Sequence, residues 1–498
     1  MPSRALTVTL NYDQSRKFVL LLAATPDARK NLNERILREG KNKFRAKALT
    51  SVFLQGGLLL DDQDELPEDA TQVWVSKGEP YAGPPKPTDN EGCRPEDVRI
   101  IGSKSFIDDK AVKQLTKVAN LPGVRVAVGM PDLHPGSRFP IGCAIASEGI
   151  YPALIGSDIG CGIALYRLSS SASRAKSNPK RLASLLRGLD DPWSGPVSEW
   201  LAHYDIAQSS EFDKANLGTV GSGNHFAEIC APDKILDASV AASLNIDEDA
   251  LYLLGSRGLG ASILERETIH DSNPYIPPDS PHLSEYLADH DYAVRWAVAN
   301  RDLVARRIKE CIFATSDLPN NYILDEEETL QQQQQSGMLP SLNKIIDVTH
   351  NSVTQHSLEL GTESRELWVH RKGAAPADKG VVPCPGSRGD MSWLLQPTGD
   401  GQFNAHSLAH GAGRRHGRQA LHTWTKIHKS TLTTTSLDSE VVCMDPDLLI
   451  EERPEAYKDV QCVVEDMEDK EMCRGVVVFR PVVTYKVREA GVRRNDKS

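Results

Sequence analysis

The glycine-rich segment 156–162, which reads GSDIGCG, carries two residue types that bind metals. Asp158 and Cys161 stand three residues apart in it, so that a carboxylate and a thiol can point into one cavity. A thiolate can bridge two metal ions, and with histidines nearby Mn, Zn or Co would suit such donors better than Ca or Mg. The alternative is a tight turn that buries a structural cysteine, so this segment alone does not establish a metal site.

Two further segments carry histidines in surroundings suited to phosphate. In segment 218–228 (GTVGSGNHFAE), Asn224 and His225 follow three glycines, whose backbone amides can bind phosphate groups. His410 lies in HGAGR, and this arginine-rich surrounding suits an anion. A histidine beside such a site can act as a nucleophile, although a structural histidine and a basic surface turn are the plain alternatives.

Taken together, these segments resemble the RtcB family of RNA ligases. The motifs MPDxHxG, DIGCG, GxxGSGNHFxE, GSRGLG, HN, HRKGA, PGSxGxxS, HGAGR and AYKD occur in this order within residues 98–486. Members of that family join RNA ends with a 2′,3′-cyclic phosphate or 3′-phosphate to 5′-hydroxyl ends. They use GTP and Mn²⁺ and pass through a histidine–GMP intermediate. The resemblance therefore implies an α+β enzyme that ligates RNA, in tRNA splicing or RNA repair.

The resemblance also implies roles for individual residues. His410 corresponds to the nucleophile that takes up GMP. The residues that would support it in catalysis are Asp132, His134 and Arg414. The residues that would bind GTP through its phosphates or its guanine are Asn224, Phe226, Glu228, Asn351, Pro385, Gly386, Ser387, Arg388, Ser392, Gly411, Ala412, Gly413, Tyr457 and Lys486. The Glu228 carboxylate could accept hydrogen bonds from N1–H and N2–H of guanine, which favours GTP over ATP.

For the metals, the resemblance implies two sites that share Cys161. Asp158 and His350 would complete one site, and His225 would belong to the other. The family segment HSGSRGLG reads LLGSRGLG here, so that Leu253 stands where the family has a metal-binding histidine. Leucine cannot coordinate a metal, and we therefore expect one or two bound Mn²⁺ ions, with the second held weakly.

These departures from the family pattern leave three hypotheses for function. The first is a divergent but active GTP-dependent RNA ligase. The second is an enzyme with one firmly held metal that guanylylates RNA ends without sealing them. The third is a non-catalytic RNA-binding or scaffold protein, and Leu253 favours the second and third over the first. A further departure is Arg388, which could add a phosphate contact or obstruct the nucleotide pocket.

The elements that must position these residues fall into two parts. Strands predicted at 5–10, 17–23, 48–54 and 73–76 around a helix within 27–44 indicate a β-grasp (ubiquitin-like) module over residues 1–80. Such a module usually binds a partner protein, and a small cap without a partner is the alternative. A proline-rich linker (81–97) then leads to the RtcB-like domain (98–486), which has helices predicted at 109–118, 179–189 and 292–314. A low-complexity insertion is expected at 316–340 and a tail at 487–498.

Composition excludes several classes of protein. With 57 Lys+Arg against 68 Asp+Glu, the net charge is −11, which argues mildly against a non-specific nucleic-acid coat but allows a local basic groove. The hydrophobic content of 40% excludes disorder of the whole chain. We find no apolar run long enough for a membrane helix and no signal peptide, so a cytoplasmic or nuclear location is expected. Nine scattered cysteines without a CxxC pair indicate neither a disulfide framework nor a zinc ribbon.

Overall fold

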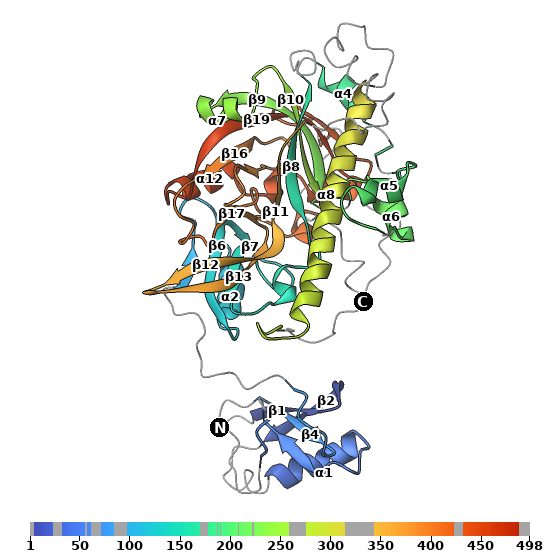
Figure 1. The fold of residues 1–498 in the computed structure, drawn as a ribbon, viewed down its shortest axis with the longest axis vertical. Coiled ribbons are helices and arrows are strands. Elements are labelled where there is room, and N and C mark those ends of the chain that lie inside the picture. Colours follow the sequence, from blue (N-terminus) through green and yellow to red (C-terminus); the bar gives the residue numbers. More distant parts are fainter. Residues whose placement is uncertain are drawn as a thin grey trace. The chain divides into compact units, whose positions relative to one another are not determined.

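The computed structural model divides the chain into two compact units, Met1–Glu91 and Gly92–Ser498 (Figure 1). It describes residues 4–22, 32–54, 57–60, 71–83, 97–169, 178–186, 188–189, 191–207, 209–221, 224–257, 275–313, 343–422 and 432–487. Most of the predicted linker, the 316–340 insertion and nearly all of the C-terminal tail lie outside these ranges. Among the described residues, no helix has the length and apolar character that a membrane crossing requires.

The N-terminal unit contains one helix packed on a four-stranded sheet. Its elements are β1 (Arg4–Leu10), β2 (Asp13–Leu22), α1 (Leu32–Lys43), β3 (Ser51–Phe53) and β4 (Gln72–Ser76). The strand order is β2-β1-β4-β3, with β1 and β4 parallel and the other neighbours antiparallel. All four predicted strands and the helix are present, although β2 begins earlier than predicted. Pairing with β1 continues to Asp13 through polar residues, and a prediction from alternating apolar side chains does not detect this part of the strand.

The larger unit is built around two main sheets, in which most neighbouring strands are antiparallel. The eight-stranded sheet has the order β11-β8-β10-β9-β19-β16-β15, with β18 paired to β19, and the five-stranded sheet has the order β12-β13-β7-β6-β5. The strands of the first sheet are β8 (Gly162–Ser169), β9 (Phe226–Ile235), β10 (Leu251–Arg257), β11 (Asn343–Thr349), β15 (Val382–Cys384), β16 (Ser392–Pro397), β18 (Glu440–Val442) and β19 (Cys473–Tyr485). Those of the second are β5 (Val98–Ile100), β6 (Val124–His134), β7 (Ile141–Ser147), β12 (Asn351–Leu360) and β13 (Glu363–Lys372). A small sheet pairs β14 (Ala374–Pro376) with β17 (Ser407–Ala409).

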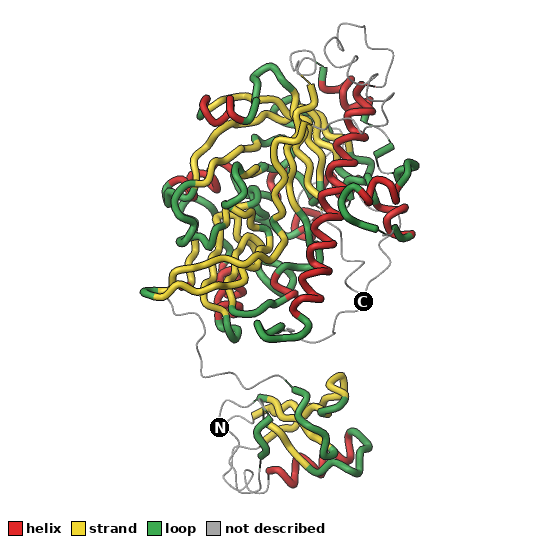
Figure 2. Tube along the Cα trace, viewed as in Figure 1, coloured by secondary structure: helices red, strands yellow, loops and turns green. Residues whose placement is uncertain are grey.

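Helices surround these sheets, and the longest, α8, runs along one side of the unit (Figure 2). The helices are α2 (Asp109–Ala119), α4 (Pro179–Leu185), α5 (Val197–Ala202), α6 (Glu211–Asn216), α7 (Ala238–Ser243), α8 (Leu283–Phe313), α10 (Arg418–His422), α11 (Pro446–Glu451) and α12 (Val460–Glu468), with 3₁₀ turns at η3 (Pro152–Leu154) and η7 (Pro454–Ala456). The three predicted helices correspond to α2, α4 and α8. Helix α8 begins nine residues earlier than predicted, because Leu283, Tyr286 and Leu287 also pack against the core.

The core of the larger unit holds the ends of the functional strands in place. One apolar cluster joins the five-stranded sheet to α12, and a second joins β8, β9, β10 and β19 to α8. The mixture of largely antiparallel sheets and separate helices agrees with the predicted α+β class. The strand ends and the loops that follow them carry the residues described next.

Candidate active site

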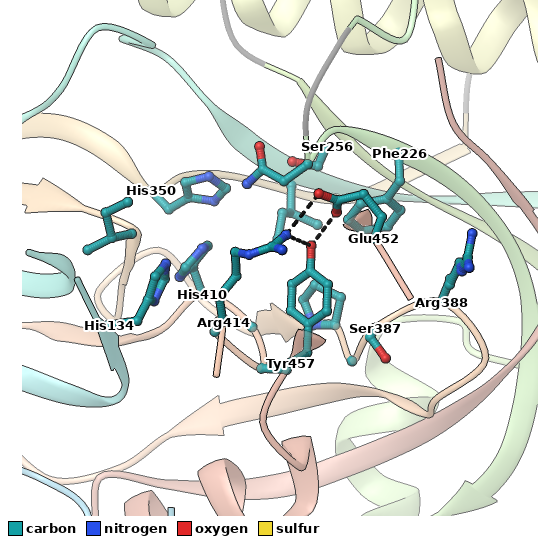
Figure 3. A pocket seen from close by; sticks show the side chains of 18 of the residues that line it. His134, Phe226, Ser256, His350, Ser387, Arg388, His410, Arg414, Glu452 and Tyr457 are labelled. Carbon is teal, nitrogen blue, oxygen red and sulfur yellow. Dashed lines mark hydrogen bonds and ion pairs between the residues drawn. The ribbon is translucent and has the colours of Figure 1, made fainter. Parts of the chain in front are cut away.

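A cavity of about 770 Å³ in the larger unit collects most of the predicted site residues (Figure 3). Its walls come from the end of β6, from β9 and β19, and from the loops after β15 and β17. The predicted residues that line it are His134, Asn224, Phe226, Glu228, His350, Pro385, Gly386, Ser387, Arg388, His410, Gly411, Ala412, Gly413, Arg414, Tyr457 and Lys486. Segments far apart in the sequence therefore meet at one place.

His410 is held by a buried carboxylate. Its Nδ1 lies 2.6 Å from Oδ2 of Asp132, whose side chain is fully buried, and the His410 backbone N–H also faces this oxygen at 3.3 Å. This contact places the proton of a neutral imidazole on Nδ1 and leaves Nε2 with a free lone pair. Two glycines make room for the arrangement, because a Cβ at Gly373 would lie 2.9 Å from His410 Cε1 and one at Gly413 would lie 2.3 Å from the Asp132 carbonyl oxygen. The HRKGA and HGAGR motifs thus allow close packing around the histidine.

The end of β6 that carries Asp132 is fixed from behind by Lys458, a residue that the sequence analysis did not single out. Its ammonium donates to the carbonyl oxygens of Pro131 and Leu133, at 2.8 and 2.7 Å. Burial lowers the pKa of Lys458 to about 8. His134 Nδ1 contacts the Asp132 carbonyl oxygen at 2.8 Å, and burial lowers the pKa of His134 to about 4, so that its ring is neutral at pH 7. The strand end is therefore held rigidly beneath His410.

Asp158, Cys161 and His225 form a compact group of metal-ligand types. Their ligand atoms lie within 4.8 Å of one another, and His225 Nε2 is 2.8 Å from Asp158 Oδ2 and 3.4 Å from Cys161 Sγ. Burial, together with the nearby Asp158 carboxylate, raises the pKa of the Cys161 thiol. A cation between these groups would favour the thiolate, and a mixed carboxylate, thiolate and imidazole set suits Mn, Zn or Co. The predicted grouping has Asp158, Cys161 and His350 at one site and Cys161 and His225 at another, and in the structure His225 lies close to both Asp158 and Cys161.

His350 lies next to this group and next to His410. Its backbone N–H donates to the Cys161 carbonyl oxygen at 2.8 Å, and its ring centroid is 4.8 Å from that of His410. The ring is buried, and its Nδ1 has no hydrogen-bond partner among the described residues. Burial, and then the neighbouring His410, lower the pKa of His350 well below its usual value. The neutral ring is therefore in a state that can bind a metal.

Leu253 occupies β10 as part of the apolar core. It is 1% exposed and pairs with Ile229 of β9 and Tyr166 of β8. The Ser256 hydroxyl of β10 faces the Cys161 thiol, with its Oγ 4.0 Å from Sγ. The strand therefore contributes no strong ligand of its own to the metal-ligand group.

Helix α8 anchors the loops that carry the predicted metal ligands. The Arg301 guanidinium donates to the Gly160 carbonyl oxygen at 2.9 Å and pairs with Asp347 of β11 at 2.6 Å. The neighbouring Asn300 accepts a hydrogen bond from the Gly218 N–H at 2.6 Å. Two adjacent buried residues of one helix thus hold the loops that lead to Cys161, to His350 and to His225. Neither residue belongs to a motif that the sequence analysis used.

At the other end of the cavity, Glu228 is buried between hydroxyl donors. Ser392 donates to its Oε1 at 3.0 Å and Thr484 to its Oε2 at 2.9 Å. Burial raises the pKa of Glu228 to about 7, although both hydroxyls and the nearby Lys486 act in the opposite direction. Ser392 does not line the cavity and instead supports Glu228 from behind. Thr484 was missed by the sequence analysis, although it stands two residues before Lys486 and hence on the same face of the chain end.

Glu452 is the most prominent residue that the sequence analysis missed. It lines the cavity with its side chain fully buried, and it receives contacts from Lys486, Arg414 and Tyr457. Burial alone raises the pKa of Glu452, but Lys486 and Arg414 oppose this effect and lower it to about 2. Two adjacent glutamates, Glu451 and Glu452, precede the AYKD motif, and nothing in the sequence distinguishes them.

Two residues expected to bind GTP have other contacts in the structure. The Asn351 side chain donates to the Asp158 carbonyl oxygen at 3.1 Å and accepts from the Gly373 N–H at 2.8 Å, away from the cavity wall. The Arg388 guanidinium lines the cavity but donates to the Leu449 carbonyl oxygen at 2.5 Å, where it supports α11. Asn351 therefore ties two loops together, and Arg388 does not project across the pocket.

These features define an enzyme site rather than a binding surface. An oriented histidine and arginines line one cavity, and the metal-ligand group lies next to His350 in its wall. This arrangement can supply the attack and the charge neutralisation that phosphoryl transfer requires.

Comparison with known proteins identifies the family. The chain matches the family model described as tRNA-splicing ligase RtcB over residues 114–192 and 194–487. It is 39% identical to RNA-splicing ligase RtcB2 of Escherichia coli over 396 residues, which cover 78% of this chain and 94% of the relative. It is 27% identical to tRNA-splicing ligase RtcB of Pyrobaculum aerophilum, over 79% of this chain and 95% of that protein. The chain therefore belongs to the RtcB family of RNA ligases.

Proposed function

We propose that this protein joins RNA 2′,3′-cyclic phosphate or 3′-phosphate ends to 5′-hydroxyl ends, with GTP as the activating nucleotide and His410 as the nucleophile. The observation that carries the proposal is the pair His410–Asp132, which leaves Nε2 of the histidine free inside a cavity that adjoins the metal-ligand group. The physiological role would be tRNA splicing or RNA repair.

In the first step, His410 Nε2 attacks the α-phosphorus of GTP. The new N–P bond forms as the bond to the β-phosphate oxygen breaks, and pyrophosphate leaves. The imidazole gains positive charge as it attacks, and Asp132, 2.6 Å from Nδ1, stabilises that charge while Nδ1 keeps its proton. Arg414, at the cavity wall, helps to neutralise the phosphates.

The next steps transfer GMP and seal the strand. A cyclic end is first opened by water to the 3′-phosphate. An oxygen of the 3′-phosphate then attacks the phosphorus on His410, and the N–P bond breaks, which returns a neutral imidazole. The 5′-hydroxyl oxygen finally attacks the 3′-phosphorus, loses its proton and displaces GMP. Activation by GMP supplies a good leaving group and divides one difficult displacement into easier ones.

Preference for guanine would follow from opposite charges at one end of the cavity. The Glu228 carboxylate can accept from guanine N1–H and N2–H, and the Lys486 ammonium can donate to O6. Phe226 and Tyr457 offer aromatic faces on the same walls. Adenine presents an acceptor at N1 and a donor at position 6, which these groups do not match.

Asp158, Cys161 and His225 fit a Mn²⁺ site, because they are borderline donors that lie close together, and His350, whose ring lies beside His410, adjoins them through the Cys161 backbone and could add a ligand. When bound there, the ion would neutralise phosphate charge and polarise phosphate oxygens. Leu253 supplies no ligand, so we propose one firmly held ion. This observation also supports a second candidate, an enzyme that guanylylates RNA ends without sealing them.

For the rest of the chain, we propose that residues 1–80 form a β-grasp module that binds a partner protein. The parallel pairing of β1 with β4 at the centre of the sheet, with α1 packed against it, supports this proposal. The family match begins at residue 114, so that the module lies outside it. Residues 98–486 would form the catalytic domain, with the linker at 81–97, the insertion at 316–340 and the tail at 487–498.

The proposal is tested by incubating the protein with GTP, Mn²⁺ and two RNAs, one with a labelled 3′-phosphate end and one with a 5′-hydroxyl end. A joined product that retains the labelled phosphate at the junction is the expected result. Accumulation of a GMP-capped 3′ end without joining would favour the second candidate. Absence of both products would overturn the proposal.

A further inference from the structure

Three predicted site residues converge on one buried carboxylate, and Figure 3 shows two of them, Arg414 and Tyr457, against Glu452. Glu452 Oε2 lies 3.1 Å from Lys486 Nζ and accepts a hydrogen bond from the Tyr457 hydroxyl, and Oε1 lies 2.9 Å from Arg414 Nη1. The Glu452 side chain has no exposed surface, while those of Lys486 and Arg414 are 6% and 15% exposed. Arg418 Nε lies farther from Oε1, at 3.7 Å, so that the carboxylate is the centre of a charged cluster in the cavity wall.

The position of the Lys486 ammonium depends on this carboxylate. Among the described residues, its other contact is the Asn224 carbonyl oxygen, at the longer distance of 3.5 Å. A buried ammonium is costly unless it is paired, because it has lost its hydration. A lysine stem has four rotatable bonds, so without Glu452 the charge would be free to turn toward other acceptors. Glu452 thus selects one direction for this charge.

We propose that Glu452 is a positioning residue that sets nucleobase specificity by aiming the Lys486 ammonium at position 6 of the purine. The inference rests on the proposed function, in which Glu228 and Lys486 bind guanine. The same carboxylate holds Arg414, a neighbour of His410 in the cavity wall, so that one group links the recognition of the base to the phosphate end. Position 6 is a carbonyl acceptor in guanine and an amino donor in adenine, which makes this contact the one that separates them most sharply.

Guanine analogues separate this contact from the one made by Glu228. In 6-thio-GTP a weak sulfur acceptor replaces O6, while N1–H and the 2-amino group remain. In inosine triphosphate the 2-amino group is missing, while O6 remains. Discrimination against the first analogue reports on Lys486, and discrimination against the second reports on Glu228.

The experiment measures binding of GTP, 6-thio-GTP and inosine triphosphate by competition with a fluorescent GTP analogue. It uses the full chain and the variants Glu452→Gln and Glu455→Gln, in which Glu455 is an exposed glutamate three residues away. A hydrogen bond from a charged group supports about a tenfold preference of the wild type for GTP over 6-thio-GTP. We expect Glu452→Gln to bring this preference near unity and to leave discrimination against inosine triphosphate unchanged. Glu455→Gln should behave as wild type.

Different results identify different failures. A Glu452→Gln variant that keeps the wild-type preference over 6-thio-GTP overturns the inference, and so does an equal loss of both discriminations, which would indicate general damage to the pocket. In the double variant with Lys486→Met, Glu452→Gln should add no further loss of preference. If Glu452→Gln does not fold, Glu452→Asp keeps the charge at shorter reach and must also reduce the preference. Failure of the wild type itself to bind GTP would refute the proposed function instead.

Discussion

Replacing Asp132 with asparagine tests how His410 is prepared for attack. The carboxylate lies 2.6 Å from Nδ1, and it is fully buried, so water cannot take its place. Asparagine keeps the shape but loses the charge, and its amide can turn its NH₂ group toward Nδ1. That orientation favours the tautomer that carries its proton on Nε2, which cannot attack. A hydrogen bond to a charged group contributes about 1.5–3 kcal/mol, which corresponds to about ten- to a hundredfold in rate.

We therefore expect Asp132→Asn to slow GMP attachment to His410 by that factor, with little change in the GTP concentration that gives half the maximal rate. Asp132 does not line the cavity, and its loss should not weaken nucleotide binding. The assay is single-turnover labelling with GTP radiolabelled at the α-phosphate. Asp213→Asn is the matched control, because Asp213 is also a fully buried carboxylate but bonds to Trp296 and Ser210, away from the cavity. Labelling of Asp132→Asn at the wild-type rate, or equal slowing in the control, would refute the reasoning.

Four further predictions follow from the site. Cys161→Ala should lower Mn²⁺ affinity by at least about a hundredfold, because loss of a direct ligand should cost at least as much as loss of an outer-shell partner. Calorimetric titration with Mn²⁺ measures this change. Lowering the pH below about 7 should weaken GTP binding. The raised pKa of Glu228 means that its carboxylate takes up a proton in this range and can no longer accept both guanine N–H groups. The Glu228→Gln variant should bind GTP weakly at every pH, without this dependence. The same burial makes the neutral acid the favoured form of Glu228 in the folded protein. Its contribution to stability is therefore full below about pH 4.5 and is lost as the pH rises through 7. Thermal melting of the wild type and of Glu228→Gln across this pH range measures the loss. Leu253→His should raise bound manganese from one ion per chain toward two at equal free Mn²⁺, and unchanged metal content would contradict a missing-ligand explanation.

The motif residues could be predicted as a group because each lies in a short glycine-flanked segment with an unusual residue composition. His410, Glu228 and Lys486 illustrate this, since the cavity brings them together from distant parts of the chain. The sequence could not reveal which histidine would lie closest to Cys161. The His225 ring contacts that thiol, whereas the recorded contact of His350 is with the Cys161 carbonyl oxygen, and these distances depend on how β8, β9 and β11 are staggered.

The residues that support the site were missed for a common physical reason. Lys458, Arg301 and Glu452 act through contacts with backbone carbonyls or with charged groups that are distant in the sequence. Such contacts depend on tertiary packing and leave no local pattern. Arg301 looks like an ordinary surface charge in the sequence, and the AYKD motif that contains Lys458 does not reveal its contacts, whereas both side chains are buried in the structure. The helix and strand predictions succeeded where apolar periodicity was strong, and their ends shifted where polar residues continued a strand or a helix.

The central claim is that His410 accepts GMP. The most direct measurement incubates the protein with Mn²⁺ and GTP radiolabelled at the α-phosphate, denatures it, and follows the label on the wild type, His410→Ala and His203→Ala. His203 is an exposed histidine at the end of α5, outside the cavity, and serves as the control. We predict label on the wild type and on His203→Ala and none on His410→Ala. Label that persists in His410→Ala, or a wild type that is never labelled at any Mn²⁺ concentration, would contradict the account.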